Sequence, residues 1–270
     1  MIRFRAPART NVIDIYDERA SAWWDARDPF FQPLHAMVPA RAAYLDRHGI
    51  DVRAKVVVDV GVGGGYVAEL LGERGAEVIG VDVARQALLA GRAHGMARTA
   101  LAQASALQLP LRDASVDVAV CTDVLVHLPL AVGGAAAAVR EMARVLRPGG
   151  VLWFSTINDT WLARLILITL GEDLLGFIHK GTHDPATFLS PGRLKQILDV
   201  NGLSLQASEG VGPVGLGKGF TLKMGQLPTR QGMWQGHALR SARRPQDAAL
   251  GPGAGAPMDS AAHAAQGSKA

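Results

Sequence analysis

The feature that most constrains this chain is a β-branched run at residues 55–65 that ends in a carboxylate and a cluster of glycines. The valines of the run suit a strand that is buried on both faces. They are Val56, Val57, Val58 and Val60. The glycines after it allow a sharp turn and a close approach of the backbone to a ligand. They are Gly61, Gly63, Gly64 and Gly65. The run therefore predicts a first buried strand followed by a cofactor-binding loop.

Two kinds of nucleoside cofactor fit such a loop. A dinucleotide fingerprint needs a third glycine three places after the second, and this chain has Tyr66 there. Asp59 lies two residues before Gly61, where its carboxylate would attract a sulfonium cofactor with an α-ammonium group and repel a pyrophosphate. The spacing therefore favours S-adenosylmethionine (SAM), and the alternatives are a dinucleotide or a glycine-rich turn without a ligand.

Strand and helix patterns alternate after this loop, which predicts a parallel sheet flanked by helices. The expected strands are 55–60, 77–83, 100–104, 116–123, 151–157, 203–208 and 233–239. The expected helices are 65–74, 86–94, 135–146 and 185–200. We therefore expect an α/β, Rossmann-like fold with a mostly parallel seven-stranded sheet and helices on both faces.

The chain divides into three parts by composition. Residues 1–50 are helix-like and aromatic and predict an N-terminal helical cover. Residues 51–242 form the expected cofactor-binding domain, with an apolar insertion at about 158–185. Residues 243–270 consist mainly of Ala, Gly, Pro and Ser, a composition typical of a disordered tail.

Composition excludes several classes of protein. The 270 residues are 49% hydrophobic and 19% charged, as in one globular domain with appended segments. The basic residues behind the net charge of +4 are scattered, which predicts a solvated surface and no nucleic-acid partner. A single cysteine, Cys121, excludes internal disulfides and a Cys-rich zinc site. The N-terminal residues lack an apolar core of signal-peptide length, so we expect a cytoplasmic protein.

Polar residues follow the predicted strands where ligands bind in an open parallel sheet, beyond the carboxyl ends. The expected cofactor residues are Asp59, Gly61, Gly63, Asp82, Ser105 and Thr122. Asp82 is placed to accept hydrogen bonds from both ribose hydroxyls, a role that dinucleotide enzymes and methyltransferases share. Ser105 is placed to contact the adenine, although a simple loop hydroxyl explains it equally well.

Methyl transfer to an oxygen requires an aligned nucleophile and the loss of its proton. His127 follows the fourth predicted strand and would face the sulfur of the cofactor, close to Asp123. His183 follows the apolar insertion directly. Either histidine is a candidate base, and the alternative for each is an ordinary surface histidine.

The stretch at 160–178 is the most apolar in the chain, but polar residues such as Arg164 and Glu172 make it too interrupted to span a bilayer. It is either a buried core helix or an interfacial helix that holds a hydrophobic substrate or touches the inner face of the membrane. In the second case, Trp161, Leu165 and Ile168 are the expected contacts with substrate or lipid.

Several motifs together resemble the ubiquinone-biosynthesis O-methyltransferases. The matching pieces lie at 22–25, 33–35, 59–65, 147–150, 154–156 and 180–184, with Arg41 and Tyr44 between the second and third. Trp-Trp-Asp at 23–25, Pro-Leu-His at 33–35 and Lys-Gly-Thr-His-Asp at 180–184 are together the most specific, and the likeness covers residues 15 to about 205.

The resemblance implies a class I methyltransferase fold and SAM as cofactor, held by positions that correspond to Arg41, Gly61, Asp82 and Thr122. It also implies O-methylation of a phenolic or quinol hydroxyl on a hydrophobic molecule, prenylated or not, in quinone biosynthesis or a related secondary pathway. Its lipid-contacting segment corresponds to 161–178 and favours the interfacial helix. The alternatives are a C- or N-methyltransferase of a natural product and a SAM-binding partner protein without turnover.

One departure from the family bears on the chemistry. The family has an acid directly before the histidine of the fourth-strand loop, where this chain has Val126. If members use that acid with Asp123 and His127 to hold a divalent ion such as Mg²⁺, two ligands remain here. The metal requirement and the oligomeric state are therefore left open, and the poor match over 220–240 leaves substrate contacts from that stretch unassigned.

Overall fold

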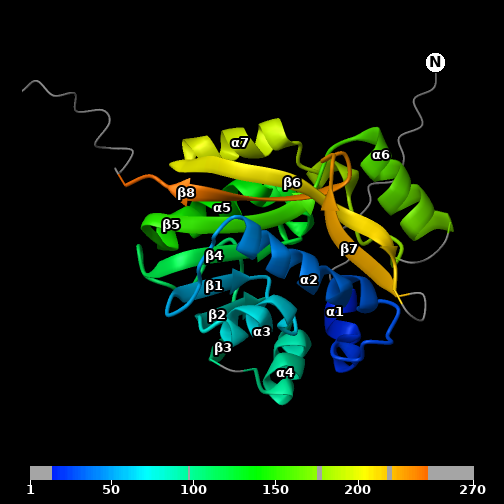
Figure 1. Ribbon diagram of the computed structural model, residues 1–270, viewed down its shortest axis with the longest axis horizontal. Coiled ribbons are helices and arrows are strands. Elements are labelled where there is room, and N and C mark those ends of the chain that lie inside the picture. Colours follow the sequence, from blue (N-terminus) through cyan, green and yellow to red (C-terminus); the bar gives the residue numbers. More distant parts are fainter. Residues whose placement is uncertain (1–13, 97, 175–177, 218–220, 243–270) are drawn as a thin grey trace, which may run out of the picture.

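A computed structural model of the chain describes residues 14–96, 98–174, 178–217 and 221–242. Its centre is an eight-stranded sheet in the order β3-β2-β1-β4-β5-β8-β6-β7 (Figure 1). The strands are β1 (Val56–Val60), β2 (Glu77–Asp82), β3 (Thr99–Gln103), β4 (Val116–Thr122), β5 (Leu146–Ile157), β6 (Leu203–Leu216), β7 (Leu222–Leu227) and β8 (Met233–Arg240). β1 to β5 run parallel, and β6, β7 and β8 pair antiparallel. The mostly parallel α/β sheet is confirmed, with one strand more than the seven expected.

The additional strand is β7. Its sequence, Leu-Lys-Met-Gly-Gln-Leu, contains no β-branched residue and has a glycine near its centre, so the pattern at 222–227 does not predict a strand. Pairing with β6 supplies its backbone hydrogen bonds, and α2 packs against it. Its neighbours in the fold, and not its own propensity, therefore define this edge of the sheet.

Helices cover both faces of the sheet. The principal ones are α2 (Gln32–Arg47), α3 (Tyr66–Glu73), α4 (Arg85–His94), α5 (Gly134–Val145) and α7 (Pro191–Val200). One core joins α2, α3 and α4 to the sheet through side chains such as Leu45, Leu71 and Leu88. The other joins α5 and α7 to the opposite face, with Met142 and Leu194 at its centre. This is the two-sided covering that the alternating pattern predicts.

The helix expected at 185–200 is divided in two. A 3-10 turn, η5 (Pro185–Thr187), precedes α7, and Ser190 caps α7 by accepting a hydrogen bond from the Arg193 amide at 3.3 Å. Pro191 stands at the first helical position, where its missing N–H is not needed. Ser190 and Pro191 therefore set the start of α7.

The aromatic cover packs on the glycine loop. It comprises α1 (Asp14–Glu18), η1 (Ala20–Ala22) and α2, and residues 1–13 of the predicted cover lie outside the described residues, as does the predicted tail. The Trp23 indole lies so close to Gly63 and Gly64 that a Cβ atom at either position would collide with it. The Tyr66 hydroxyl donates a hydrogen bond to the Trp23 carbonyl. These two positions therefore need glycine to accommodate the cover.

The apolar insertion is one helix of unusual geometry. It starts as α6 (Trp161–Ala163), capped by Thr160, and continues as the π-helix η4 (Arg164–Leu174). In Figure 1 it projects at the edge of the molecule. Trp161 is 72% exposed and Leu165, Ile166 and Leu174 are also exposed, whereas Ile168 is buried. No helix among the described residues is long and apolar enough to cross a membrane.

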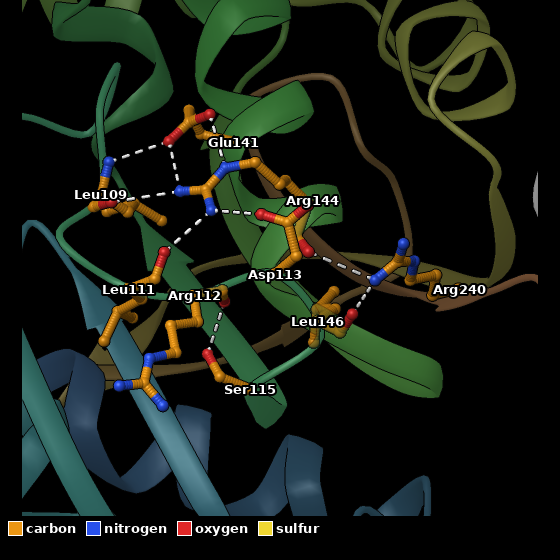
Figure 2. Close-up of polar contacts among 9 residues, drawn as sticks. All are labelled: Leu109, Leu111, Arg112, Asp113, Ser115, Glu141, Arg144, Leu146 and Arg240. Atoms are coloured by element: carbon orange, nitrogen blue, oxygen red, sulfur yellow. Dashed lines mark hydrogen bonds and ion pairs between the residues drawn. The ribbon is translucent and has the colours of Figure 1, made fainter.

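A polar network anchors the end of the sheet where β4 begins (Figure 2). The Arg144 guanidinium of α5 donates to the carbonyls of Leu109 and Leu111 and to the carboxylates of Asp113 and Glu141. These contacts tie the β3–β4 connection to α5, and Arg240 of β8 donates to the Leu146 carbonyl nearby. The network lies away from the carboxyl ends of the strands, so its function is to hold the fold.

Candidate active site

A cavity of about 770 Å³ opens at the carboxyl ends of β1, β2 and β4. This volume is within the usual range for a small-molecule site. The structure gathers nine of the predicted site residues in its wall: Arg41, Asp59, Gly61, Gly63, Asp82, Ser105, Thr122, Asp123 and His127. They come from the cover and from four strand ends, as expected of an open parallel sheet.

Asp59 is the most unusual of these groups. It is 1% exposed, and its Oδ2 is buried without a hydrogen-bond partner among the described residues. Burial raises the pKa of this carboxyl from its ordinary value of 3.8 to about 7, with Arg41 opposing the rise and Asp82 adding to it. An unpaired acceptor of this kind in a cavity wall is suited to a ligand that brings its own cation.

Asp82 fastens the glycine loop to the end of β2. Its Oδ2 accepts from the Gly63 amide at 2.8 Å and its Oδ1 from the Ala84 amide at 2.8 Å. Burial raises the pKa of Asp82, and these backbone hydrogen bonds oppose the rise. A carboxylate has about four lone-pair sites, so Asp82 can still accept from a hydroxyl beside its backbone donors at Gly63, Val83 and Ala84.

Arg41 connects the cover to the end of β4. Its Nη2 lies 2.5 Å from Asp123 Oδ2, and the Ser155 hydroxyl donates to Asp123 Oδ1 at 2.6 Å. Asp123 has a φ of 62°, a strained conformation for a residue with a side chain. Two partners on a strained aspartate indicate that its position, and not only its charge, is fixed by the surrounding structure.

The two candidate bases are neighbours. The ring centroids of His127 and His183 are 5.2 Å apart. His127 lines the cavity, and burial together with His183 lowers its pKa from 6.5 to about 3, although a hydrogen bond to the Thr182 backbone acts in the opposite direction. His183 is not itself in the wall, but the cavity reaches Asp184 beside it. Its Nδ1 lies 2.9 Å from Oε1 of Glu172.

Sequence reasoning did not assign Glu172, Tyr16 or Trp23 to the site. Tyr16 and Trp23 line the cavity, and the Tyr16 ring lies edge-on to His127 at 6.1 Å. Burial, reinforced by Asp123 and Glu172, raises the pKa of the Tyr16 phenol. The aromatic composition of the cover was the available signal for Tyr16 and Trp23. The signal for Glu172 was an acid inside an otherwise apolar helix.

The residues around Asp123 and His127 do not fit the divalent-metal site that the resemblance to the family suggests. Val126 is fully buried in a core cluster that also contains Ile157, Ile168 and Phe188. Asp123 is already held by Arg41 and Ser155. Within the described part of the chain, no three His, Cys, Asp or Glu side chains are grouped so as to hold an ion.

The predicted contacts of the apolar insertion lie outside the cavity. Trp161, Leu165 and Ile168 are absent from its wall. Trp161 and Leu165 face outward, whereas Ile168 packs in the core with Val126. A π-helix has i→i+5 hydrogen bonds, so its side chains point in directions that α-helical spacing does not predict.

The fold and the site define a class of protein. Residues 58–154 match the family model described as "Methyltransferase domain". A magnesium protoporphyrin IX methyltransferase from Synechocystis PCC 6803, solved with bound SAH, superposes with a TM-score of 0.60 at 20% identity over 86% of this chain and 96% of that one. An S-adenosylmethionine dependent methyltransferase from Mesorhizobium loti superposes with a TM-score of 0.55 at 20% identity, over 75% of this chain and 100% of that one. The fold is that of the class I SAM-dependent methyltransferases.

Curated relatives narrow the class to a family. The ubiquinone biosynthesis O-methyltransferase of Idiomarina loihiensis is 37% identical over 75% of this chain and 83% of its own length. The ubiquinone biosynthesis O-methyltransferase of Chromobacterium violaceum is 34% identical over 74% of this chain and 85% of its own length. The chain belongs to the ubiquinone biosynthesis O-methyltransferase family and is a SAM-dependent methyltransferase.

Proposed function

We propose that this enzyme methylates a phenolic or quinol hydroxyl of a hydrophobic small molecule such as a prenylated catechol. The observation that carries the proposal is the cavity, because it joins the carboxylates of Asp59 and Asp82 to the imidazole of His127 in one wall. Apolar residues complete the wall near His127, including Leu128 and Leu130. The names of the relatives support an acceptor of this kind.

The residues present fit SAM. Asp59 offers an unpaired buried oxygen to the α-ammonium group, and Asp82 offers its remaining acceptor capacity to the ribose hydroxyls. Ser105 is assigned to the adenine, Arg41 and Thr122 to the remaining polar contacts, and Gly61 and Gly63 to the close approach of the loop. When bound, SAM supplies an electrophilic methyl group whose transfer leaves the sulfur as a neutral thioether.

The work of the protein is then to hold the acceptor oxygen in line with that methyl group and to receive its proton. His127 lies in the wall and is neutral near pH 7, so it accepts a hydrogen bond from the hydroxyl and orients it. His127 and His183 are the candidate proton acceptors. No step is assigned to a divalent ion, because the ligand set for one is incomplete.

The outward face of α6 and η4 is the proposed site of peripheral contact with the membrane. Trp161, Leu165, Ile166 and Leu174 expose apolar side chains there. A tryptophan among aliphatic residues suits the boundary between lipid headgroups and acyl chains. Contact there would bring a membrane-dissolved, prenylated acceptor to the enzyme, whereas Ile168 belongs to the core.

Calorimetry followed by a methylation assay tests the proposal. Titration of the purified chain with SAM should show saturable binding, and addition of a prenylated catechol should give a methyl ether. An acceptor methylated on carbon or nitrogen would replace the oxygen assignment. SAM binding without methyl transfer to any phenol would overturn the proposed acceptor class.

A further inference from the structure

Glu172 is a buried carboxylate inside the apolar insertion. It is 4% exposed, and its oxygens have three nitrogen partners in the segment that follows η4. Oε2 accepts from the Gly181 amide at 2.8 Å, and Oε1 accepts from the His183 amide at 3.0 Å. Oε1 also lies 2.9 Å from Nδ1 of His183. A buried carboxylate is costly unless such donors satisfy it, so this arrangement fixes both Glu172 and the loop around it.

The pairing determines where the proton of a neutral His183 resides. An ionised carboxylate only accepts hydrogen bonds, so Nδ1 must carry the hydrogen. The lone pair of the imidazole is then on Nε2, and this nitrogen can take a proton. A base that is held and oriented by a third group is the usual arrangement in enzymes that activate a hydroxyl.

His183 also lies in the right part of the site. Its ring centroid is 5.2 Å from that of His127, which lines the cavity, and the nearby residues Asp184 and Thr187 are also in the wall. The His127 ring has a hydrogen bond to the Thr182 backbone, but its Nδ1 is buried with no hydrogen-bond partner among the described residues. Of the two histidines, only His183 is backed by a carboxylate that would stabilise the imidazolium.

We infer that Glu172 is the positioning residue that makes His183 the general base of the methyl transfer. This rests on the proposed function. The acceptor O–H bond breaks as the oxygen bonds to the methyl carbon, the S–C electron pair stays on sulfur, and the proton goes to Nε2 of His183. Glu172 touches neither substrate nor cofactor, and acts by fixing the tautomer and the direction of the ring. A protein base in this position performs the deprotonation that a metal would otherwise assist.

The first experiment compares Glu172→Gln with the wild-type chain, using a prenylated catechol and SAM. We expect kcat to fall about 100-fold, the contribution typical of a general base, while KM and the SAM dissociation constant stay unchanged. In ¹⁵N NMR of histidine-labelled protein, His183 should lose its fixed Nδ1–H tautomer. Glu209→Gln is the matched control, since Glu209 is a half-buried glutamate beside a histidine, His48, outside the cavity wall.

A second experiment covers the case in which Glu172→Gln does not fold. Free imidazole should restore turnover to His183→Ala, because it fills the vacated space and pairs with Glu172. It should restore none to Glu172→Ala/His183→Ala, and failure to rescue the single variant would overturn the inference. Full kcat in folded Glu172→Gln would overturn the role of Glu172 alone. A wild-type chain that binds SAM but methylates no phenol would instead overturn the proposed function.

Discussion

Asp59 leads to a quantitative prediction about the pH dependence of SAM binding. In the ligand-free protein, burial holds the pKa of this carboxyl at about 7, so Asp59 is largely protonated at pH 6. In the proposed binding mode, the α-ammonium group of SAM pairs with the ionised form of Asp59. Binding at pH 6 should therefore release about 0.9 proton, and affinity should fall about tenfold for each pH unit below 7 and level off above it.

The same shift makes a prediction about stability, with the sign fixed by its direction. A carboxyl whose pKa is higher in the folded than in the unfolded state favours folding when it is protonated. Its stabilising effect is thus complete below about pH 4 and is lost as the pH rises to about 7. From 3.8 to about 7 the loss is at most about 4 kcal/mol. Asp59→Asn should remove this loss, and the ligand-free variant should be the more stable protein at pH 8.

Calorimetric titration in buffers of different ionisation enthalpy measures the released protons directly. SAH carries the same ammonium group without the sulfonium charge, so it should release the same number. Asp59→Asn should bind both ligands more weakly at pH 8 and show no proton release at pH 6. The reasoning is refuted if wild-type protein releases no proton at pH 6, or if Asp59→Asn keeps the wild-type pH slope. Asp82, whose pKa is also raised, would then be the group to examine.

Three further predictions concern other parts of the chain. Asp82→Ala should weaken SAM binding at least about tenfold with an unchanged circular dichroism spectrum, the loss expected for hydrogen bonds to a charged group; equal affinity would reject the ribose assignment. Trp161→Glu/Leu165→Glu should sediment less with anionic liposomes than wild type, whereas Val200→Glu, at an exposed position on α7, should not; equal sedimentation of all three proteins would reject the membrane face. Arg144→Met should lower the free energy of unfolding by about 2–3 kcal/mol by leaving carbonyls and carboxylates unpaired. Chemical denaturation measures this, SAM affinity should not change, and a stability equal to wild type would contradict the structural role of the network.

The position of the proposed cofactor-binding residues was predictable because it depends on local patterns and one topological rule. A β-branched run predicts β1, and the carboxyl ends of parallel strands meet at one edge of the sheet. Asp59 and Asp82 were thereby placed together before their contacts were known. The 2.8 Å hydrogen bond from the Gly63 amide to Asp82 joins the end of β2 to the glycine loop after β1, in agreement with that placement.

The catalytic half was less predictable because its contacts are long-range or follow unusual geometry. Arg41 and Asp123 are 82 positions apart, and nothing in either local pattern indicates that they pair. Glu172 looked like an interruption of an apolar helix, because its partners appear only when the chain turns back beyond residue 178. Ile168 was expected to contact substrate or lipid because its segment is apolar, whereas the structure places it in the core with Val126.

The packing of Trp23 on Gly63 and Gly64 also constrains how this sequence can change over time. A side chain at either glycine is excluded by the indole, as well as by any ligand that approaches the loop. Replacing Trp23 with a small residue would remove the first restriction and leave the second. Substitutions in the two segments, 40 positions apart, must therefore be compatible with each other. A chimera that exchanges only the first 50 residues with another methyltransferase would carry a cover whose shape fits a different loop.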